Sequence, residues 1–225
     1  MSSIASDPKT AVHYPEQNGE PLAESTLQFR WIATLQGGIA ALFWRNPSIF
    51  VAGDLLWYPV EGDNTTRQAP DVMVVFGRPK GDRGSYRQWD EGGLAPQVVF
   101  EVLSPGNRPS AMARKLLFYE RFGVEEYYIY DPDRRTLEGY VRSADGEFDP
   151  IKTMHGHVSP RLGIRFDMSG EELVVYRPDG KPFSSYVELM AQAEGAEAAR
   201  RQVQQENERL RARLRALGVD PDAAG

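Results

Sequence analysis

A mixed α/β fold with an appended helix is the fold class that three patterns in the sequence predict. Over residues 22–44, apolar residues recur at spacings of three and four, which is typical of an amphipathic helix with one buried face. After the opening Gln97, residues 97–103 are apolar on both faces of an expected strand except at Glu101, and such runs are typical of central strands covered by helices on both sides. Residues 186–217 are rich in Ala, Glu, Gln, Arg and Leu and carry a heptad pattern, which indicates a long C-terminal helix.

The remaining elements follow from shorter runs and their turn residues. A helix is predicted over 109–122, because Gly123 after it is a good C-terminal cap. The core strands are predicted at 49–58, 71–76, 97–103 and 126–130, and further strands in an antiparallel meander at 136–142, 147–152 and 172–176. The order of the core elements is therefore helix, three strands, helix, strand.

We expect the chain to divide into four parts. Residues 1–21 are polar and rich in Pro and Ser, which predicts a flexible N-terminal arm. Residues 22–180 hold all the elements of the core and form the expected main domain. Residues 185–217 form the C-terminal helix, and residues 218–225 are a predicted disordered tail.

Composition excludes several classes of protein. The 225 residues include no cysteine, which rules out disulfides, thiolate zinc sites and cysteine nucleophiles. No run of about 18 apolar residues is present, so no membrane span is expected, and the N-terminus lacks the form of a secretion signal. A cytoplasmic protein fits these features. The formal net charge of −6 argues against indiscriminate nucleic-acid binding but permits a local basic face.

Three charged residues stand in apolar surroundings and form the candidate active site. Glu101 interrupts a buried strand, and Asp71 opens an earlier apolar strand. Lys115 lies on the side of the 109–122 helix that is expected to face the sheet. A lone buried carboxylate needs a cationic partner. Mg²⁺ or Mn²⁺ bound by Asp71 and Glu101 would supply one, with Lys115 orienting a water or neutralising negative charge. This combination predicts hydrolysis of a phosphodiester.

Each of these residues also has a plain structural interpretation. Asp71 can start a strand and face water, Glu101 can pair with an arginine at the edge of the core, and Lys115 can extend its ammonium to the solvent. Convergence of all three on one sheet is what favours a site. Asp54, in apolar company on its strand, and Glu24, near the start of the first helix, are candidate auxiliary residues.

The long polar loop at 77–96 is a weak candidate for nucleic-acid binding, because loops of this length are more often functional than idle. The loop combines cationic side chains, which can bind phosphates, with Tyr86 and Trp89, which can stack on bases. Asp82, Asp90 and Glu91 dilute the charge, so a solvated loop is the alternative. The cations are Arg78, Lys80, Arg83 and Arg87.

The C-terminal heptads predict a homodimer. Val203, Leu210 and Leu217 fall at position d of the heptad, and Asn207 and Leu214 fall at position a. Asparagine at position a selects parallel dimers in many coiled coils. The alternative is a helix that packs on its own domain.

A set of short motifs resembles the Uma-two family of restriction-endonuclease-like proteins, which belongs to the PD-(D/E)xK nuclease superfamily. The resemblance covers roughly residues 22–178. The residues that carry it are Pro70-Asp71, Glu101-Val102-Leu103-Ser104-Pro105, Lys115, Tyr119, Gly123-Val124-Glu125-Glu126-Tyr127-Tyr128 and Asp131-Pro132.

The resemblance implies an αβββαβ nuclease core, a mixed sheet flanked by helices, with an acidic metal site. It matches Asp71 to the aspartate of the superfamily motif and Glu101 to its D/E position, and it adds Tyr119 as an auxiliary residue. The motif lysine would fall at Leu103, and the family supplies it from the following helix, here Lys115.

Two positions depart from the family pattern, and they leave two functions open. Ala111 stands where many members have an acidic residue, and Gln28 stands where many have a histidine. The leading hypothesis is a Mg²⁺- or Mn²⁺-dependent endonuclease acting on DNA. The alternative is an inactive nuclease fold that binds DNA or protein.

Overall fold

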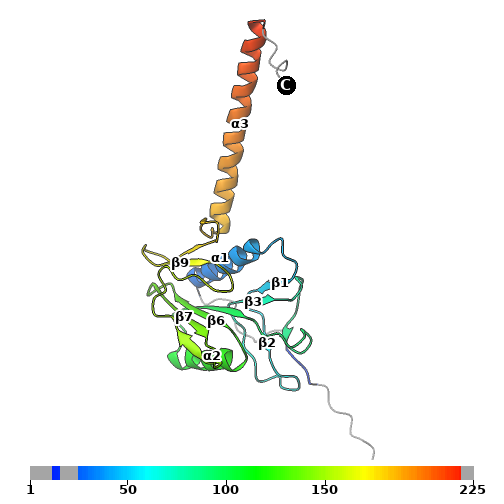
Figure 1. Ribbon diagram of the computed structural model, residues 1–225, viewed down its shortest axis with the longest axis vertical. Helices are drawn as coiled ribbons and strands as arrows, with labels where there is room; N and C mark the ends of the chain where they lie inside the picture. The colour runs from blue at the N-terminus through cyan, green and yellow to red at the C-terminus, as the bar shows by residue number, and fades with distance from the viewer. Residues whose placement is uncertain (1–11, 16–24, 219–225) are drawn as a thin grey trace, which may run out of the picture. The chain divides into compact units, whose positions relative to one another are not determined.

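The computed structural model describes residues 12–15 and 25–218, and these divide into two compact units between Phe183 and Ser184 (Figure 1). The second unit contains one long helix, α3 (Tyr186–Ala216). Of the predicted N-terminal arm only residues 12–15 are described, and of the predicted tail only Gly218. No helix in these described ranges combines the length and hydropathy that crossing a bilayer requires. The cytoplasmic location stays a prediction.

A six-stranded mixed sheet forms the centre of the first unit. Only β5 and β6 run parallel to each other, and the other neighbouring pairs are antiparallel. The sheet order is β1 (Ile49–Ala52), β3 (Val72–Phe76), β5 (Val98–Val102), β6 (Glu126–Asp131), β7 (Thr136–Arg142) and β8 (Phe148–Pro150). Strand β5 is therefore internal, as its two-faced apolar run predicts.

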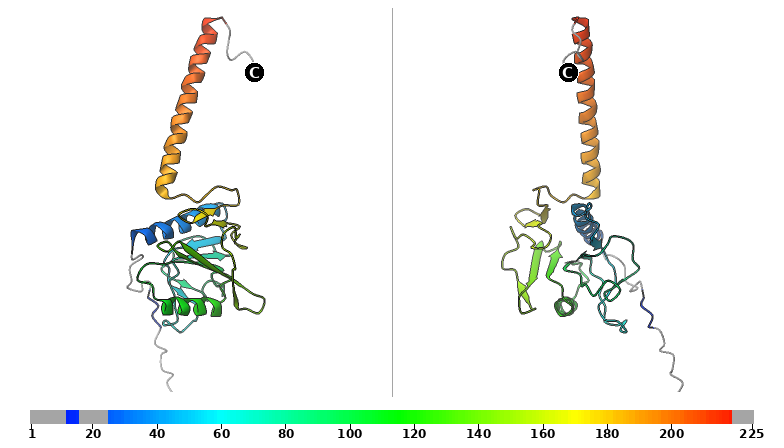
Figure 2. Two further views of the ribbon diagram at one scale, coloured as in Figure 1. Left: turned by 90° about the vertical axis from the view of Figure 1, so that its left-hand side faces the viewer. Right: turned by 45° about the vertical axis from the view of Figure 1, so that its right-hand side comes forward.

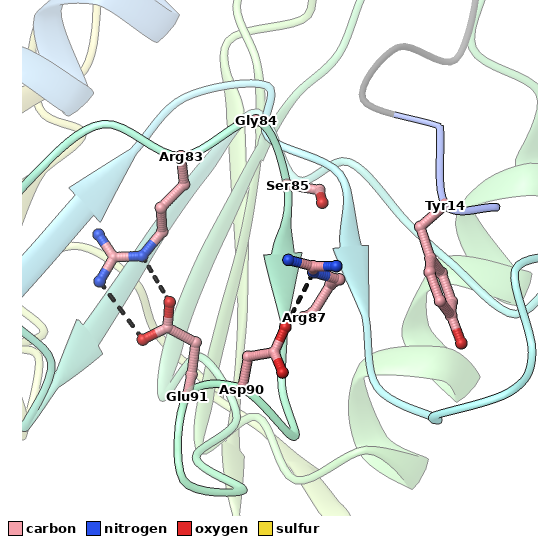
Figure 3. Close-up of a pocket in the computed structure, with 7 residues that line it drawn as sticks. All are labelled: Tyr14, Arg83, Gly84, Ser85, Arg87, Asp90 and Glu91. Atoms are coloured by element: carbon pink, nitrogen blue, oxygen red, sulfur yellow. Dashed lines mark hydrogen bonds and ion pairs between the residues drawn. The ribbon is translucent and has the colours of Figure 1, made fainter. Parts of the chain in front are cut away.

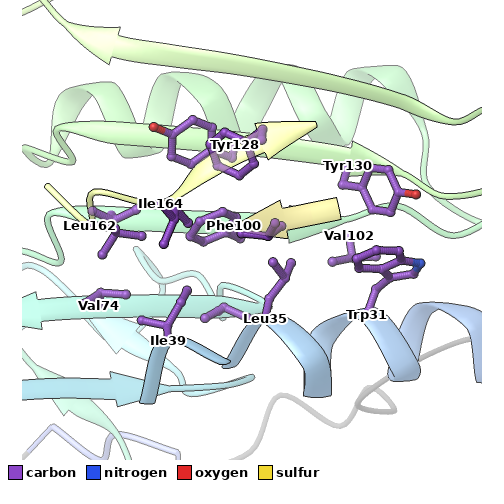
Figure 4. Close-up of a cluster of buried hydrophobic side chains, with 14 of the residues drawn as sticks. Trp31, Leu35, Ile39, Val74, Phe100, Val102, Tyr128, Tyr130, Leu162 and Ile164 are labelled. Atoms are coloured by element: carbon purple, nitrogen blue, oxygen red, sulfur yellow. The ribbon is translucent and has the colours of Figure 1, made fainter. Parts of the chain in front are cut away.

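Helix α1 (Thr26–Leu42) covers one face of this sheet (Figure 2). Its buried stripe of Trp31, Leu35 and Ile39 packs against side chains from the internal strands, among them Phe100 and Tyr128 (Figure 4). The small sheet of β9 (Arg165–Asp167) and β10 (Val174–Tyr176) contributes to the same hydrophobic cluster. This cluster fixes the internal strands from the side opposite Glu101.

Helix α2 (Pro109–Arg121) covers the other face, together with β2 (Trp57–Tyr58) and β4 (Tyr86–Arg87). The ring of Trp57 is stacked with that of Tyr119 at 6.3 Å between centroids, and it meets Phe118 edge-on. Because side chains alternate along a strand, Val99 and Glu101 of β5 point toward this face while Phe100 and Val102 point toward α1. The charged site therefore lies on the α2 side.

The predicted strand at 49–58 is wrong as a single element. Strand β1 ends at Ala52, and the chain turns at Asp54, which has a φ of +47°. The turn is held because the Asp54 N–H donates to the carbonyl of Pro70 at 3.1 Å. The chain then forms β2, which pairs in parallel with β4 inside the predicted 77–96 loop.

The predicted meander is partly wrong. Strands β7 and β8 extend the main sheet as expected. The run at 172–176, however, supplies β10, which pairs with β9 in a separate sheet of two strands. Strand β9 has three residues, too few for an alternating pattern to reveal it.

The helices lie close to their predicted bounds. Helix α1 begins at Thr26 rather than residue 22, because the hydroxyl of Ser25 accepts a hydrogen bond from the Gln28 N–H and caps it. Ser185 and Glu188 form a capping box at the start of α3. The predicted fold class, a mixed sheet flanked by helices with a long C-terminal helix, is confirmed.

Candidate active site

Glu101 is buried between β5 and α2 with only 2% of its surface exposed, and both its oxygens are hydrogen-bonded. The Lys115 ammonium donates to Oε2 at 2.6 Å, and the Tyr119 hydroxyl donates to Oε1 at 2.5 Å. The cation that compensates this carboxylate is therefore the predicted lysine, not an arginine. A buried carboxylate that accepts hydrogen bonds from one ammonium and one hydroxyl is held in a fixed position.

Helix geometry explains why Lys115 and Tyr119 reach the same carboxylate. The two residues are four positions apart on α2, so they lie on the same side of the helix one turn from each other. Burial by itself would lower the pKa of Lys115. The charges of Glu101 and Asp71 oppose this effect, and together with the hydrogen bond to Glu101 they raise the pKa above its ordinary value. Lys115 is therefore a cation at neutral pH.

Asp71 directly precedes β3, the strand that pairs with β5 beside Glu101. The antiparallel register pairs Val72 with Phe100, and one step further along it places Asp71 opposite Glu101. The Val102 N–H donates to Asp71 Oδ2 at 2.6 Å, which ties the Asp71 carboxylate to the end of β5. Burial, followed by the charge of Glu101, raises the pKa of Asp71 well above its ordinary value, although Lys115 acts in the opposite direction.

Asp54 adds a third carboxylate to this end of the sheet. Its N–H donates to the carbonyl of Pro70, next to Asp71 in the chain, and its side chain is half-buried. Burial raises the pKa of Asp54, Lys115 lowers it, and the charge of Glu101 raises it further. Asp54 is thus electrostatically coupled to the pair formed by Glu101 and Lys115. Glu24, the other predicted auxiliary residue, lies outside the described residues.

Gln28 supports the site from α1. Its side chain is 6% exposed, and its amide Nε2 donates to the carbonyl oxygen of Val102 at 2.8 Å. Both backbone groups of Val102 are thereby engaged by side chains, those of Gln28 and Asp71. Sequence reasoning noted Gln28 only as a departure from the family pattern. A buried polar residue on the apolar side of a predicted helix is the signal that could have revealed this contact.

The acidic residues of the site have the chemistry of a hard-cation site. Asp71 and Glu101 offer carboxylate oxygens, which are the ligands that Mg²⁺ and Mn²⁺ prefer. Within the described residues, no group of three or more His, Asp or Glu is arranged to hold a metal. Two carboxylates are compatible with Mg²⁺, because this ion keeps several of its waters. The residues present therefore fit such an ion.

The cations of the 77–96 loop are engaged within the chain. Arg83 forms an ion pair with Glu91 at 2.6 Å and Arg87 with Asp90 at 3.0 Å, at the edge of a polar hollow of about 210 Å³ that Tyr14 also lines (Figure 3). Lys80 donates to the carbonyls of Phe43 and Trp44, and Arg78 donates to that of Gly77. Each of these side chains thus has an acid or carbonyl partner within the chain, and their role in nucleic-acid binding stays a prediction.

Comparison with known proteins identifies the family. Residues 4–169 match Uma2, a family described as "Putative restriction endonuclease". The chain belongs to the Uma2 family. A crystal structure of a "putative nuclease belonging to DUF820 from Anabaena variabilis ATCC 29413" is similar with a TM-score of 0.45 and 16% identity, over 60% of this chain and 72% of that chain. No curated protein matches.

Within this Uma2 protein, Tyr119 is expected to be a positioning residue whose removal lowers stability. Tyr119→Phe deletes the hydroxyl that donates to Glu101 Oε1 and leaves a buried carboxylate oxygen without that partner. The free energy of unfolding should fall by about 1–3 kcal/mol, measured by urea denaturation.

Tyr127→Phe is the matched control for this prediction. The hydroxyl of Tyr127 is buried without a hydrogen-bond partner, and its ring lies 4.9 Å from that of Tyr119. Removing an unpartnered hydroxyl should leave stability unchanged within about 0.5 kcal/mol or raise it. An equal loss in both variants would mean that the Tyr119 contact to Glu101 contributes nothing.

Proposed function

We propose that the protein is a metal-dependent endonuclease that hydrolyses phosphodiester bonds of DNA, with Asp71, Glu101 and Lys115 as its catalytic residues. The observation that carries the proposal is the buried Glu101 carboxylate, hydrogen-bonded to Lys115 and placed opposite Asp71 by the strand register. Membership of a family described as "Putative restriction endonuclease" supports the nuclease activity and the choice of DNA.

The charge balance of the site supports a divalent cation. Asp54, Asp71 and Glu101 face one ammonium, that of Lys115, so full ionisation leaves a formal charge of −2. Burial is the main cause that raises the pKa values of Asp54 and Asp71, and the charge of Glu101 raises both further. Asp71 and Glu101 would hold the Mg²⁺ or Mn²⁺ ion. When bound, the ion supplies a Lewis acid that polarises the phosphate and lowers the pKa of a water.

Lys115 has a distinct role, because it is the cation already at the site. Its side chain is 21% exposed, and its ammonium donates to Glu101 Oε2. Lys115 Nζ would donate to a phosphate oxygen as negative charge develops there. Tyr119 would keep the Glu101 carboxylate in place through Oε1.

The test is cleavage of supercoiled plasmid with Mg²⁺, with Mn²⁺ and with EDTA. Wild-type protein should convert supercoiled DNA to nicked or linear forms only with metal. Lys115→Met should lower the single-turnover rate constant about 10²- to 10³-fold at saturating DNA. Arg114→Met is the matched control, because Arg114 precedes Lys115 on α2 but is exposed, and it should keep the wild-type rate.

Three outcomes would contradict this proposal. Cleavage that continues in EDTA, or that Lys115→Met leaves unchanged, would place the activity elsewhere or in a contaminant. Wild-type protein that shifts DNA in a gel but leaves it intact with both metals would favour the alternative function, a nuclease fold that binds DNA without cutting it. The Glu101–Lys115 ion pair would then be purely structural.

A further inference from the structure

Helix α3 carries an apolar face that no other described residue of its own unit covers. Each of its residues from Tyr186 to Ala216 is exposed, and none is buried. Its apolar side chains include Val203, which is 62% exposed, and Leu210, which is 49% exposed. A helix of 31 residues gains most of its stability in water from packing an apolar face. The exposed apolar face of α3 therefore needs a partner that packs against it.

The spacing of the apolar residues fits a coiled coil. Val203, Leu210 and the C-cap Leu217 occupy successive d positions, and Leu214 occupies an a position. The steps of seven, with intervening steps of three and four, keep this stripe on one side of a supercoiled helix. Positions outside the seam in this half of α3 are Gln, Glu, Ala or Arg. One narrow seam, rather than a broad apolar face, is left to be covered.

We propose that this seam binds the same seam of a second copy of the chain, as a parallel coiled coil in register. Asn207, at an a position, is the residue that favours a second copy of α3 as the partner. In the in-register parallel pair the two Asn207 amides face each other and can share a hydrogen bond. A shift by one heptad would instead place Asn207 against Leu214 or Arg200 of the partner, and would leave an amide buried without a partner.

The charges beside the seam agree with the same register. Glu206 occupies a g position and Arg211 the following e position. Parallel in-register helices bring g of one chain beside the following e of the other, so Glu206 meets Arg211 twice in the dimer, once on each side. Both contacts join opposite charges, which supports a second copy as the occupant. This inference does not depend on the proposed nuclease activity.

A charge exchange between two variants of the full-length protein tests the pairing. In Glu206→Arg homodimers two arginines would meet at each contact, and in Arg211→Glu homodimers two glutamates would meet. Each variant alone should dimerise at least about tenfold more weakly than wild type. An equimolar mixture should restore the dimer, because every contact in the mixed pair again joins opposite charges. Sedimentation equilibrium measures all three samples.

Controls separate the seam from the rest of the helix. Glu208→Arg makes the same change of charge at a position outside the seam, and it should keep the wild-type dimer. Leu210→Asp places a charge within the seam and should give a monomer that still shows the thermal unfolding of the first unit. A wild-type monomer, a dimer that survives Leu210→Asp, or a mixture no more associated than its two components would each overturn the proposal.

Discussion

Glu101→Gln should abolish metal-dependent DNA cleavage, with a loss of about 10³-fold or more in the single-turnover rate. Glutamine keeps the shape of the side chain and can still accept from Tyr119 or Lys115, but it removes the negative charge that a divalent cation requires. Plasmid nicking with Mg²⁺ and with Mn²⁺ measures the loss. Binding of Mn²⁺ alone should weaken in parallel, which gives a readout independent of cleavage.

Glu126→Gln is the matched control. Glu126 is a carboxylate buried as deeply as Glu101, but it lies on β6 and accepts hydrogen bonds from Tyr128 and Ser159, on the α1 side of the sheet. Its replacement should affect stability without affecting Mn²⁺ binding. If Glu101→Gln cleaves DNA at the wild-type rate, the mechanism proposed for this site is wrong.

Glu101→Gln should also lower the free energy of unfolding, because Glu101 forms an ion pair with Lys115 in the structure. Glutamine removes the negative charge that pairs with the partly buried Lys115 ammonium at 2.6 Å and leaves that ammonium only a neutral acceptor. We expect the free energy of unfolding to fall by about 1–3 kcal/mol. Adding Lys115→Met to Glu101→Gln should recover part of the loss, since the double variant removes the unpaired charge. Additive effects in urea denaturation would mean that the two side chains do not interact.

The core of the site could be predicted because its residues conflict with their local surroundings. Glu101 stands out as the one charge in an apolar run, and Lys115 stands out on the sheet-facing side of a helix. Tyr119 entered through the family resemblance, and the structure places it one helical turn from Lys115 on the same side of α2. Where a local pattern is strong and a single residue breaks it, the exception marks a candidate site.

Features set by contacts between distant segments could not be predicted. The turn at Asp54 depends on a hydrogen bond to the carbonyl of Pro70, and the role of Gln28 depends on one to Val102, which is 74 positions away. The ion pairs of Arg83 and Arg87 depend on how the 77–96 loop folds back on itself. Composition shows that acids are present in that loop, but not which cation each one meets.

The affinity of the protein for Mn²⁺ should rise with pH above the range in which an ordinary aspartate ionises. Burial and the charge of Glu101 raise the pKa of Asp71 well above its usual value, so the Asp71 carboxyl keeps its proton at higher pH. A metal must displace that proton to bind. Calorimetric titration with Mn²⁺ across mildly acidic to neutral pH measures the trend. Asp71→Asn should bind Mn²⁺ weakly and lose most of the pH dependence.

The stability of the metal-free protein should fall as pH rises, whereas its affinity for Mn²⁺ should rise. Measuring both tests whether Asp71 is the group responsible. Because the folded pKa of Asp71 is raised, the folded state holds more protons than the unfolded state between the two pKa values, and stability falls as pH rises through the folded pKa. Asp71→Asn should remove this fall, since an amide still accepts from the Val102 N–H and never ionises. Asp63→Asn is the control, because hydrogen bonds to Thr65 and Thr66 lower the pKa of Asp63 and keep it ionised throughout. If Asp71→Asn and wild type lose stability equally as pH rises, then Asp71 is not the group that couples protons to folding and metal binding.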